Sequence, residues 1–208
     1  ESLDSDMPPF ALALGNTDLA NARWRGGIVG TRAPSGDGVR FATRCAETLV
    51  ALDCAVVSGG AAGIDAAAHN AALESGGNTI FIVPADILGY CPAWIEAAIS
   101  GRALFLSESL PGALWTTHAA VQRNRLIAAM AQAVWVVEPR KEGGSIRTAR
   151  IAAGLNRPVA CYRPPDTFKN VIPWLVFSGP DALSKDTIRG MLEHAGPTQG
   201  DLFKPPPT

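Results

Sequence analysis

Several features that would assign this chain to other classes of protein are absent or scarce. It has no apolar run of about 18 residues, the length that a membrane-spanning helix needs. Its formal net charge is −1, so it lacks the general excess of lysine and arginine of a protein that coats nucleic acid, although a local basic site fits this balance. Its three histidines do not have the spacing of metal ligands. We therefore expect no membrane span, no metal site and no bound cofactor.

Cysteine is also scarce, and its four positions lie far apart. Cys45, Cys54, Cys91 and Cys161 form no Cys-x-x-Cys pair, so they are interpreted as buried free thiols in a reducing compartment. The acidic stretch from Glu1 to Asp6 does not resemble a signal peptide. We therefore expect a cytoplasmic protein.

The composition is that of a folded domain. Hydrophobic residues make up 47% of the 208 positions and charged residues 18%, which allows a sizeable core. We expect a flexible lead-in over residues 1–9, a single domain over residues 10–195, and a disordered tail rich in proline and glycine over residues 196–208.

Short apolar runs alternate with segments of helical spacing along this domain. That alternation indicates an α/β fold with a mostly parallel sheet and helices on both faces. The expected strands are Gly27 to Arg32, the run that begins at Cys54, Thr79 to Val83, Ala103 to Leu106, Ala133 to Val137, and Pro158 to Cys161. The expected helices are Gly38 to Leu52, the Ala-rich segment after Asp65, Ala93 to Ile99, Val121 to Ala131, Ser145 to Gly154, and Asp186 to His194.

The stretch from Cys54 to Leu73 has the layout of a phosphate cradle. An apolar run leads into a turn with Gly59, Gly60 and Gly63, and a helix follows with Asp65 as its expected N-cap. Glycines let a ligand approach the backbone, and a helix start favours an anion. A tight strand-to-helix turn without a ligand is the other interpretation of the same residues.

Two details of this stretch limit the interpretation. Ser58 stands where the dinucleotide-binding fingerprint has its first glycine. His69 follows four residues after Asp65 on the same helical face, and a lone histidine there is more often a packed structural residue than a catalytic one. Ligands of such sheets bind beyond the carboxyl ends of the strands, and polar residues follow each of the first five predicted strands there.

A second group of residues suggests an anion site at this edge. The segment from Gln122 to Arg125 places two arginines at a predicted helix start, where the helix dipole disfavours cations. They either bind phosphate, together with Arg32 and possible help from Arg140 and Lys141, or form salt bridges at a solvated helix end. Gly143-Gly144-Ser145 opens another helix and is a further candidate cradle. Trp115, in a loop, is a candidate for stacking on a base.

Taken in order, these motifs resemble the DNA-processing protein A family (DprA, also called Smf), over about residues 8–163. The motifs are Gly30-Thr31-Arg32, Ser58-Gly59-Gly60-Ala61-x-Gly63-Ile64-Asp65 with His69, Ser107-Glu108, Arg123-Asn124-Arg125-Leu126-Ile127-Ala128, and Gly144-Ser145-x-x-Thr148-Ala149.

The resemblance implies an extended Rossmann-like fold in a bacterial, cytoplasmic homodimer. It also implies non-catalytic binding of single-stranded DNA, with loading of a RecA-type recombinase during natural transformation. By position, the implied DNA- and phosphate-binding residues are Thr31, Arg32, Ser58, Gly59, Gly60, Gly63, Asp65, Arg123, Asn124, Arg125, Lys141, Gly143, Gly144 and Ser145.

Two alternatives use the same cradle. Nucleoside-monophosphate phosphoribohydrolases resembling the LOG proteins have Pro-Gly-Gly-x-Gly-Thr-x-x-Glu, whose glutamate assists N-glycosidic cleavage. Here the stretch from Glu142 to Arg150 has no acidic residue after its glycines, so that role would fall to another carboxylate. The candidates are Asp65, Asp86, Glu108 and Glu138. The other alternative is a nucleotide sensor that binds without turnover.

Overall fold

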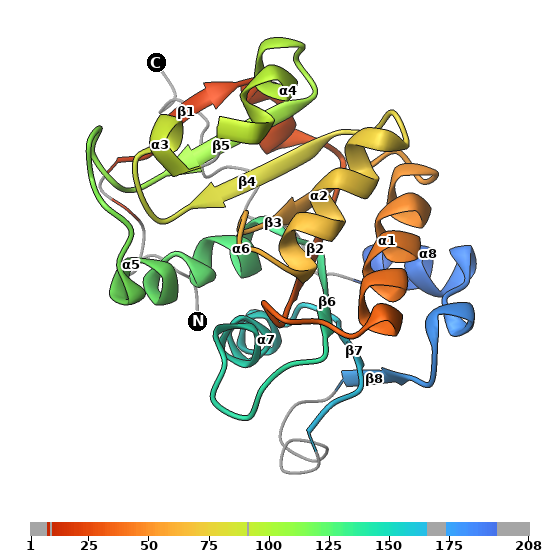
Figure 1. Cartoon of the computed structure of the whole chain (residues 1–208). Coiled ribbons are helices and arrows are strands. Elements are labelled where there is room, and N and C mark those ends of the chain that lie inside the picture. The colour runs from red at the N-terminus through yellow and green to blue at the C-terminus, as the bar shows by residue number, and fades with distance from the viewer. Residues whose placement is uncertain (1–7, 9, 91, 166–173, 195–208) are drawn as a thin grey trace.

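A computed structural model describes residues 8, 10–90, 92–165 and 174–194 of the chain. Its strands are β1 (Leu12–Gly15), β2 (Trp24–Gly30), β3 (Cys54–Ser58), β4 (Thr79–Val83), β5 (Ala103–Ser107), β6 (Ala133–Val137), β7 (Val159–Tyr162) and β8 (Trp174–Phe177). They form one sheet in the order β1-β5-β4-β3-β2-β6-β7-β8 (Figure 1). Only the β1–β5 pair of this sheet is antiparallel. The expectation of a mostly parallel sheet in an α/β fold is confirmed.

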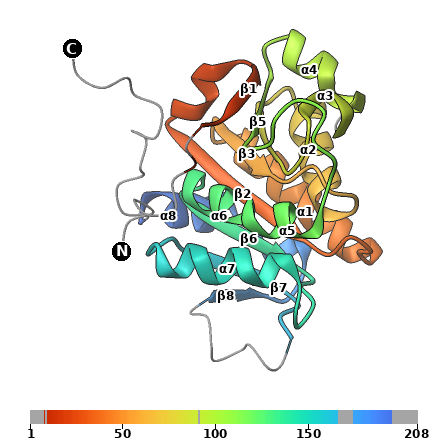
Figure 2. The ribbon, with the colours of Figure 1, turned by 90° about the vertical axis from the view of Figure 1, so that its left-hand side faces the viewer.

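Helices cover both faces of the sheet. The α-helices are α1 (Gly36–Val50), α2 (Ile64–Glu74), α3 (Ile87–Tyr90), α4 (Ile95–Ile99), α5 (Thr117–Gln122), α6 (Asn124–Met130), α7 (Gly144–Gly154) and α8 (Lys185–Glu193). Short 3-10 turns are η2 (Thr17–Asn21), η3 (Pro92–Trp94) and η5 (Pro180–Ala182). One face packs against η2, α6 and α7, and the other against α1, α2, α8 and α4. Figure 2 shows α5, α6 and α7 side by side.

The apolar strands supply both cores because successive side chains of a strand point to opposite faces. In β4, Ile80 and Ile82 pack on the face covered by η2 and α6, whereas Phe81 and Val83 pack on the face covered by α4. All five residues of β4 are buried. A strand covered on both faces favours apolar side chains throughout, and the one polar residue of β4, Thr79, has its hydroxyl hydrogen-bonded to the Val56 carbonyl.

Helix α1 shows how local sequence positions an element. Ser35 is its N-cap, and the Ser35 hydroxyl accepts a hydrogen bond from the Gly38 N–H at 3.1 Å. Its apolar residues recur at helical spacing, so Phe41, Cys45 and Leu49 are fully buried against the sheet. The polar residues between them remain on the outer face.

The structure differs from the sequence expectation in one helix and in two strands. The helix expected from Val121 to Ala131 is two helices, α5 and α6, which meet at Arg123. Strands β1 and β8 were not among the expected strands. The lead-in over residues 1–9 falls almost wholly outside the described residues, and the tail over residues 196–208 falls wholly outside them.

The thiols match their interpretation where they are described. Cys45, Cys54 and Cys161 are free and buried, and Cys91 lies outside the described residues. Burial raises the pKa of all three thiols, that of Cys161 to about 12. Among the helices of the described residues, none combines the length and apolar character that crossing a membrane requires.

Candidate functional site

A cavity of about 460 Å³ opens at the carboxyl edge of the sheet. It lies where the end of β2, the start of α7 and the α5–α6 segment approach one another. Its walls contain arginines and small residues such as glycine and alanine, which leave the backbone accessible. The lining residues are Val29, Gly30, Thr31, Arg32, Ala61, Asp65, Trp115, Thr117, Ala120, Val121, Arg123, Asn124, Ile127, Arg140, Glu142, Gly143, Gly144, Ser145 and Thr148.

The start of α7 forms one wall of this cavity. Gly143 is the N-cap, and no side chain of the described residues caps the helix there. Gly143, Gly144 and Ser145 all line the cavity. Free backbone N–H groups and the positive end of the helix dipole therefore face the opening, an arrangement that favours an anion.

Asn124 fixes the position of this helix start. Its Nδ2 donates to the Gly144 carbonyl at 3.3 Å, and the Thr148 hydroxyl donates to the same carbonyl at 3.2 Å. Asn124 is itself buried at the beginning of α6. Asn124 therefore ties α6 to α7 and has a structural part in the site.

Arg32 and Trp115 form the opposite side of the opening. The Arg32 guanidinium lies over the Trp115 ring, 5.4 Å from its centroid, in a cation–π contact. Arg32 is exposed in the turn after β2, and Trp115 is 39% exposed in the loop before α5. Arg140, also exposed, adds another cation to the lining. The opening thus presents positive charge beside an accessible aromatic ring.

Arg123 lies deeper, beneath the cavity. It is only 5% exposed, and its Nη1 donates to the Ile82 carbonyl at 2.7 Å. Its guanidinium occupies the space beside Gly59 that a side chain would need. The positive charge of Arg123 also reaches Asp65 and His69, where it opposes the rise of the Asp65 pKa and adds to the lowering of the His69 pKa. Arg123 therefore organises the floor of the cavity.

Asp65 is not the N-cap of α2, as the sequence suggested. Gly63 holds that position with φ +84°, and a Cβ there would stand 2.5 Å from the Thr31 carbonyl oxygen. Asp65 lies one residue inside the helix, where its Oδ2 accepts the Gly59 N–H at 3.2 Å and the Ala61 backbone also hydrogen-bonds to it. Burial raises the pKa of this carboxyl. The carboxyl group of Asp65 therefore accepts the hydrogen bond from the glycine turn that the sequence suggested for a phosphate.

His69 is a packed residue, as its spacing suggested. It is fully buried, and its Nδ1 lies 2.6 Å from the hydroxyl of Thr79. That hydroxyl donates to the Val56 carbonyl at 2.8 Å, so it accepts from His69. The ring stacks on Phe81 with centroids 3.6 Å apart. Burial lowers its pKa well below the ordinary value. His69 does not line the cavity and has no catalytic geometry toward it.

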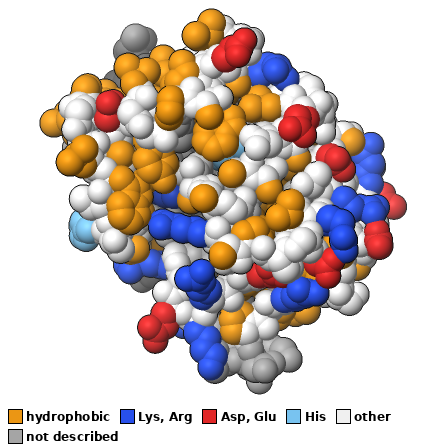
Figure 3. Space-filling view, in the orientation of Figure 1, with side chains coloured by type: hydrophobic (Ala, Val, Ile, Leu, Met, Phe, Trp, Pro, Cys, Tyr) orange, Lys and Arg blue, Asp and Glu red, His pale blue; other side chains and the backbone are white. Residues whose placement is uncertain are grey.

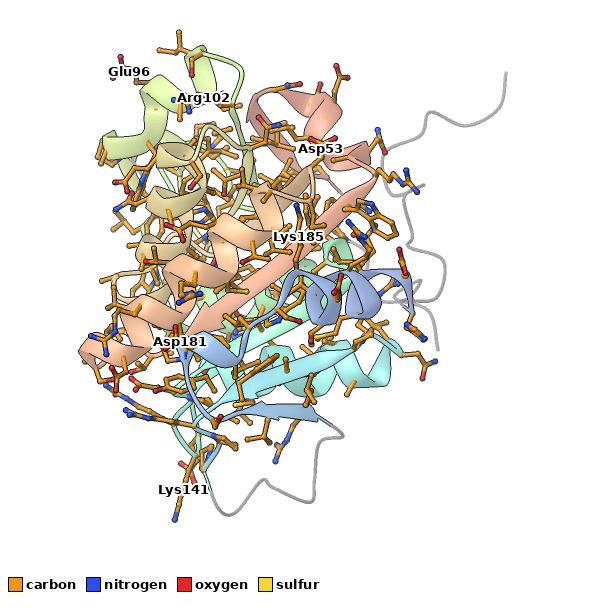
Figure 4. The ribbon with its side chains drawn as sticks, turned by 90° about the vertical axis from the view of Figure 1, so that its right-hand side faces the viewer. Asp53, Glu96, Arg102, Lys141, Asp181 and Lys185 are labelled. Carbon is orange, nitrogen blue, oxygen red and sulfur yellow. The ribbon has the colours of Figure 1, made fainter. Side chains whose placement is uncertain are left out.

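Arg125 and Lys141 lie outside the cavity lining. Both Nη atoms of Arg125 donate to the carboxylate of Glu108, and this pair is largely buried. Lys141 is exposed, and Figure 4 shows it projecting from the lower end of the molecule into solvent. Arg125, which the sequence suggested as a phosphate ligand, forms an ion pair with Glu108 in this structure.

The start of α1 is also filled by a carboxylate. Glu138, after β6, accepts the Ser35 N–H at 2.8 Å and the Ser35 hydroxyl at 2.5 Å. Arg163 donates to the same carboxylate at 3.0 Å. In Rossmann-like dinucleotide sites a phosphate lies at the start of the first helix. In this structure Glu138 occupies the corresponding place.

The cavity unites eight of the fourteen residues expected at a site. These are Thr31, Arg32, Asp65, Arg123, Asn124, Gly143, Gly144 and Ser145. Ser58, Gly59, Gly60, Gly63, Arg125 and Lys141 do not line it, and the Ser58 hydroxyl donates to the Ile28 carbonyl. The cavity also contains Ala61, Thr117, Glu142 and Thr148, which were not among the expected binding residues and which the packing of α2, α5 and α7 brings to the opening.

The fold and the cavity define a Rossmann-like α/β protein with an arginine-lined opening at the carboxyl edge of its sheet. The family model "DNA recombination-mediator protein A" matches residues 2–172. This chain belongs to that family. It is 36% identical to the putative DNA processing protein DprA of Mycobacterium tuberculosis over 184 residues, covering 86% of this chain and 47% of the relative. It therefore spans about half the length of that curated relative.

Two solved structures support the fold. DNA processing protein A from Helicobacter pylori, described for its single-stranded DNA binding mode, superposes with a TM-score of 0.76 at 22% identity, covering 91% of this chain and 89% of that one. DNA processing protein A from Streptococcus pneumoniae superposes with a TM-score of 0.70 at 27% identity, covering 86% of this chain and 67% of that one. The extended Rossmann-like fold is thereby confirmed.

Proposed function

We propose that this chain binds single-stranded DNA without catalysis and acts in DNA recombination of the natural-transformation type. The observation that carries the proposal is the opening itself, where Arg32 rests on Trp115 beside the uncapped start of α7. A phosphate fits between the guanidinium and the helix start, and a base fits against the aromatic ring.

The exposed ring favours a single strand over a duplex as the ligand. In a duplex the faces of the bases are stacked on one another, whereas an unpaired base can stack on an aromatic side chain. A site built from phosphate contacts and one ring has little means of reading base edges. Binding should therefore be tolerant of sequence and should weaken steeply with salt. The relative from Helicobacter pylori, described as binding single-stranded DNA, supports this choice.

The disposition of the carboxylates supports binding without turnover. Glu108 is paired with Arg125, and Glu138 is bonded to Ser35 and Arg163. Asp86 does not line the cavity, and Asp65 is buried with the Gly59 N–H as a partner. Glu142 lines the cavity but is exposed on the loop before α7. A glycoside cleavage needs a positioned carboxylate, and these arrangements argue against that chemistry.

Fluorescence anisotropy of a labelled oligo-dT of about 20 nucleotides tests the proposal. Matched duplex and nucleoside monophosphates serve as competitors, at two salt concentrations. We expect salt-sensitive binding that the duplex competes for poorly. Arg32→Ala should weaken it by about 1–3 kcal/mol, the worth of a charge-assisted bond to phosphate. Arg189→Ala, which removes an exposed arginine of α8, is the matched control.

Failure of the strand to bind would point to one of the two alternative functions. If the strand does not bind and a nucleoside monophosphate stabilises the protein instead, the pocket is a small-nucleotide site. Release of free base from that nucleotide would then identify a hydrolase, and saturable binding without release would identify a sensor.

The proposed function also includes an oligomeric state and a protein partner. We propose a homodimer that loads a RecA-type recombinase onto the bound strand in the bacterial cytoplasm. Membership of the recombination-mediator family supports this part. Sedimentation analysis would give the oligomeric state. The rate at which a RecA-type recombinase forms filaments on a coated strand, with and without this protein, would test the loading.

A further inference from the structure

Three exposed leucines lie on two neighbouring segments, one of which leads into the opening through Trp115. Leu88 and Leu110 are each 63% exposed, and Leu114 is 85% exposed. Leu88 lies on α3, and the other two lie on the loop between β5 and α5. We call these three side chains the leucine ledge. Isolated exposed leucines are ordinary, but a group of them on neighbouring segments indicates a surface that meets a ligand.

Backbone hydrogen bonds hold the two segments of the ledge together. The Asp86 N–H donates to the Ala113 carbonyl at 2.9 Å, which joins the loop to the chain just before α3. The Ala113 N–H donates to the Leu110 carbonyl at 3.0 Å and closes a turn within the loop. These backbone hydrogen bonds hold the two segments in place, so the leucines are exposed without a conformational change.

The ledge continues directly into the cavity. Leu114 precedes Trp115, whose ring lines the cavity and carries the Arg32 guanidinium. Figure 3 shows hydrophobic side chains gathered over α3 and the β5–α5 loop, with Lys and Arg side chains next to them. A ligand that leaves the charged opening on this side therefore meets an apolar surface.

We propose that the leucine ledge receives the bases of the nucleotides that flank the phosphate held in the opening. This proposal rests on the proposed function and names the path of the strand. Bases have apolar faces, and a single strand can turn them toward the protein while its phosphates remain in water. The leucines carry no charge, so the ledge adds affinity through buried apolar area and does not change the number of phosphates that are neutralised.

Strands that lack bases provide the test. Two labelled strands of about 12 nucleotides have the same number of phosphates, one made of thymidine throughout and the other abasic at its flanks. The parent protein should bind the complete strand about fivefold more tightly, a difference that matches burial of a few apolar groups. Leu110→Ser/Leu114→Ser should bind both strands alike, with the same salt dependence as the parent.

Two further variants test whether the preference for the complete strand depends on the ledge. Leu88→Ser changes the ledge from the α3 side and should also reduce the preference. Ile99→Ser is the matched control, because Ile99 is 81% exposed on α4 at the amino end of β5, whereas the ledge follows the carboxyl end of that strand. This control should retain the full preference.

Several outcomes would contradict the proposal that the leucine ledge receives bases. One is a parent that binds both strands equally, and another is a ledge variant that keeps the preference. A ledge variant that loses self-association but keeps the preference would make this surface a contact between copies of the chain. Failure of the parent to bind any strand would instead refute the proposed function, and the ledge with it.

Discussion

The guanidinium group of Arg123 lies directly against Gly59. A Cβ on residue 59 would stand 1.7 Å from Nη1 of Arg123. Arg123 cannot simply turn aside, because it is buried and donates to the Ile82 carbonyl at 2.7 Å. Gly59 is therefore needed for the packing of the turn beneath the opening, in addition to any approach of a ligand.

Substitution of this glycine should destabilise the fold. We expect Gly59→Ala to lower the free energy of unfolding by about 1–3 kcal/mol, the usual cost of overpacking a buried site. Urea denaturation followed by circular dichroism measures this. Gly190→Ala is the control, since a Cβ in α8 meets nothing within 4 Å and should leave stability unchanged or raise it. Equal stability of Gly59→Ala and the parent would contradict the packing argument.

The ion pair between Arg125 and Glu108 should affect stability more than DNA binding. Only 13% of the Arg125 side chain and 19% of the Glu108 side chain are exposed. We expect Arg125→Ala to cost about 1–3 kcal/mol of stability, because a charged bond is lost and Glu108 is left without its partner. Its strand affinity should change less than that of Arg32→Ala. In a double-mutant cycle, Glu108→Ala/Arg125→Ala should cost less than the sum of the single variants. Additive costs would show that the two side chains act independently.

Substitutions of Trp115 and Arg32 should affect the salt dependence of strand binding differently. Trp115→Ala should weaken strand binding by about 1–3 kcal/mol through lost stacking, with the slope against salt concentration unchanged. Arg32→Ala should reduce that slope by about 1, because one fewer phosphate is neutralised. Anisotropy titrations across a salt series measure both quantities. The same change of slope in the two variants would mean that Trp115 acts only by placing Arg32.

The buried His69 makes stability depend on pH. Its pKa in the folded protein lies well below the ordinary value of 6.5, first because of burial and then because of the Arg123 charge. Below pH 6.5 the unfolded chain therefore takes up a proton that the folded protein does not. The contribution of His69 is complete above this pH and is lost as pH falls, by up to about 1.4 kcal/mol per unit.

A pair of variants isolates this effect. The free energy of unfolding is measured between about pH 5.5 and pH 7.5, a range in which few other groups titrate. His69→Gln should flatten the decline toward low pH, whatever its absolute stability. His118→Gln, which removes an exposed histidine, should leave the decline as in the parent. An unchanged slope in His69→Gln would assign the pH dependence to other groups.

The central strands were predictable because burial on both faces leaves a simple pattern. The run from Ala133 to Val137 was predicted with its observed bounds, and so was the run from Thr79 to Val83. Strand β8 is an equally apolar run, but it is only four residues long and lies at the sheet margin, where Leu175 and Val176 are exposed. A short edge strand is fixed by its neighbour β7 and not by its own pattern.

The site was predictable in its location and less so in its contacts. Arg32 follows the carboxyl end of β2, and Gly144 opens the helix that follows β6, so both belong to the carboxyl edge by topology. The partners of these residues depend on loop conformation. Nothing in the local sequence says that Arg125 pairs with Glu108, or that Trp115 supports Arg32. The sequence places Asp65 near a helix start, but its bond to Gly59 depends on the φ of Gly63.

Of the three helices α1, α2 and α7, the first two have a carboxylate of the chain itself beside their starts at this edge of the sheet. Glu138 accepts the Ser35 N–H before α1, and the Asp65 side chain accepts the Gly59 N–H of the turn before α2. A polyanion that lies along this edge can place one phosphate, and not three, at a helix end. Under the proposed function, its residence time on a single copy would be set by the α7 contact and the arginines around it. Lasting occupancy of a long strand would then come from several copies acting together, each with a brief hold.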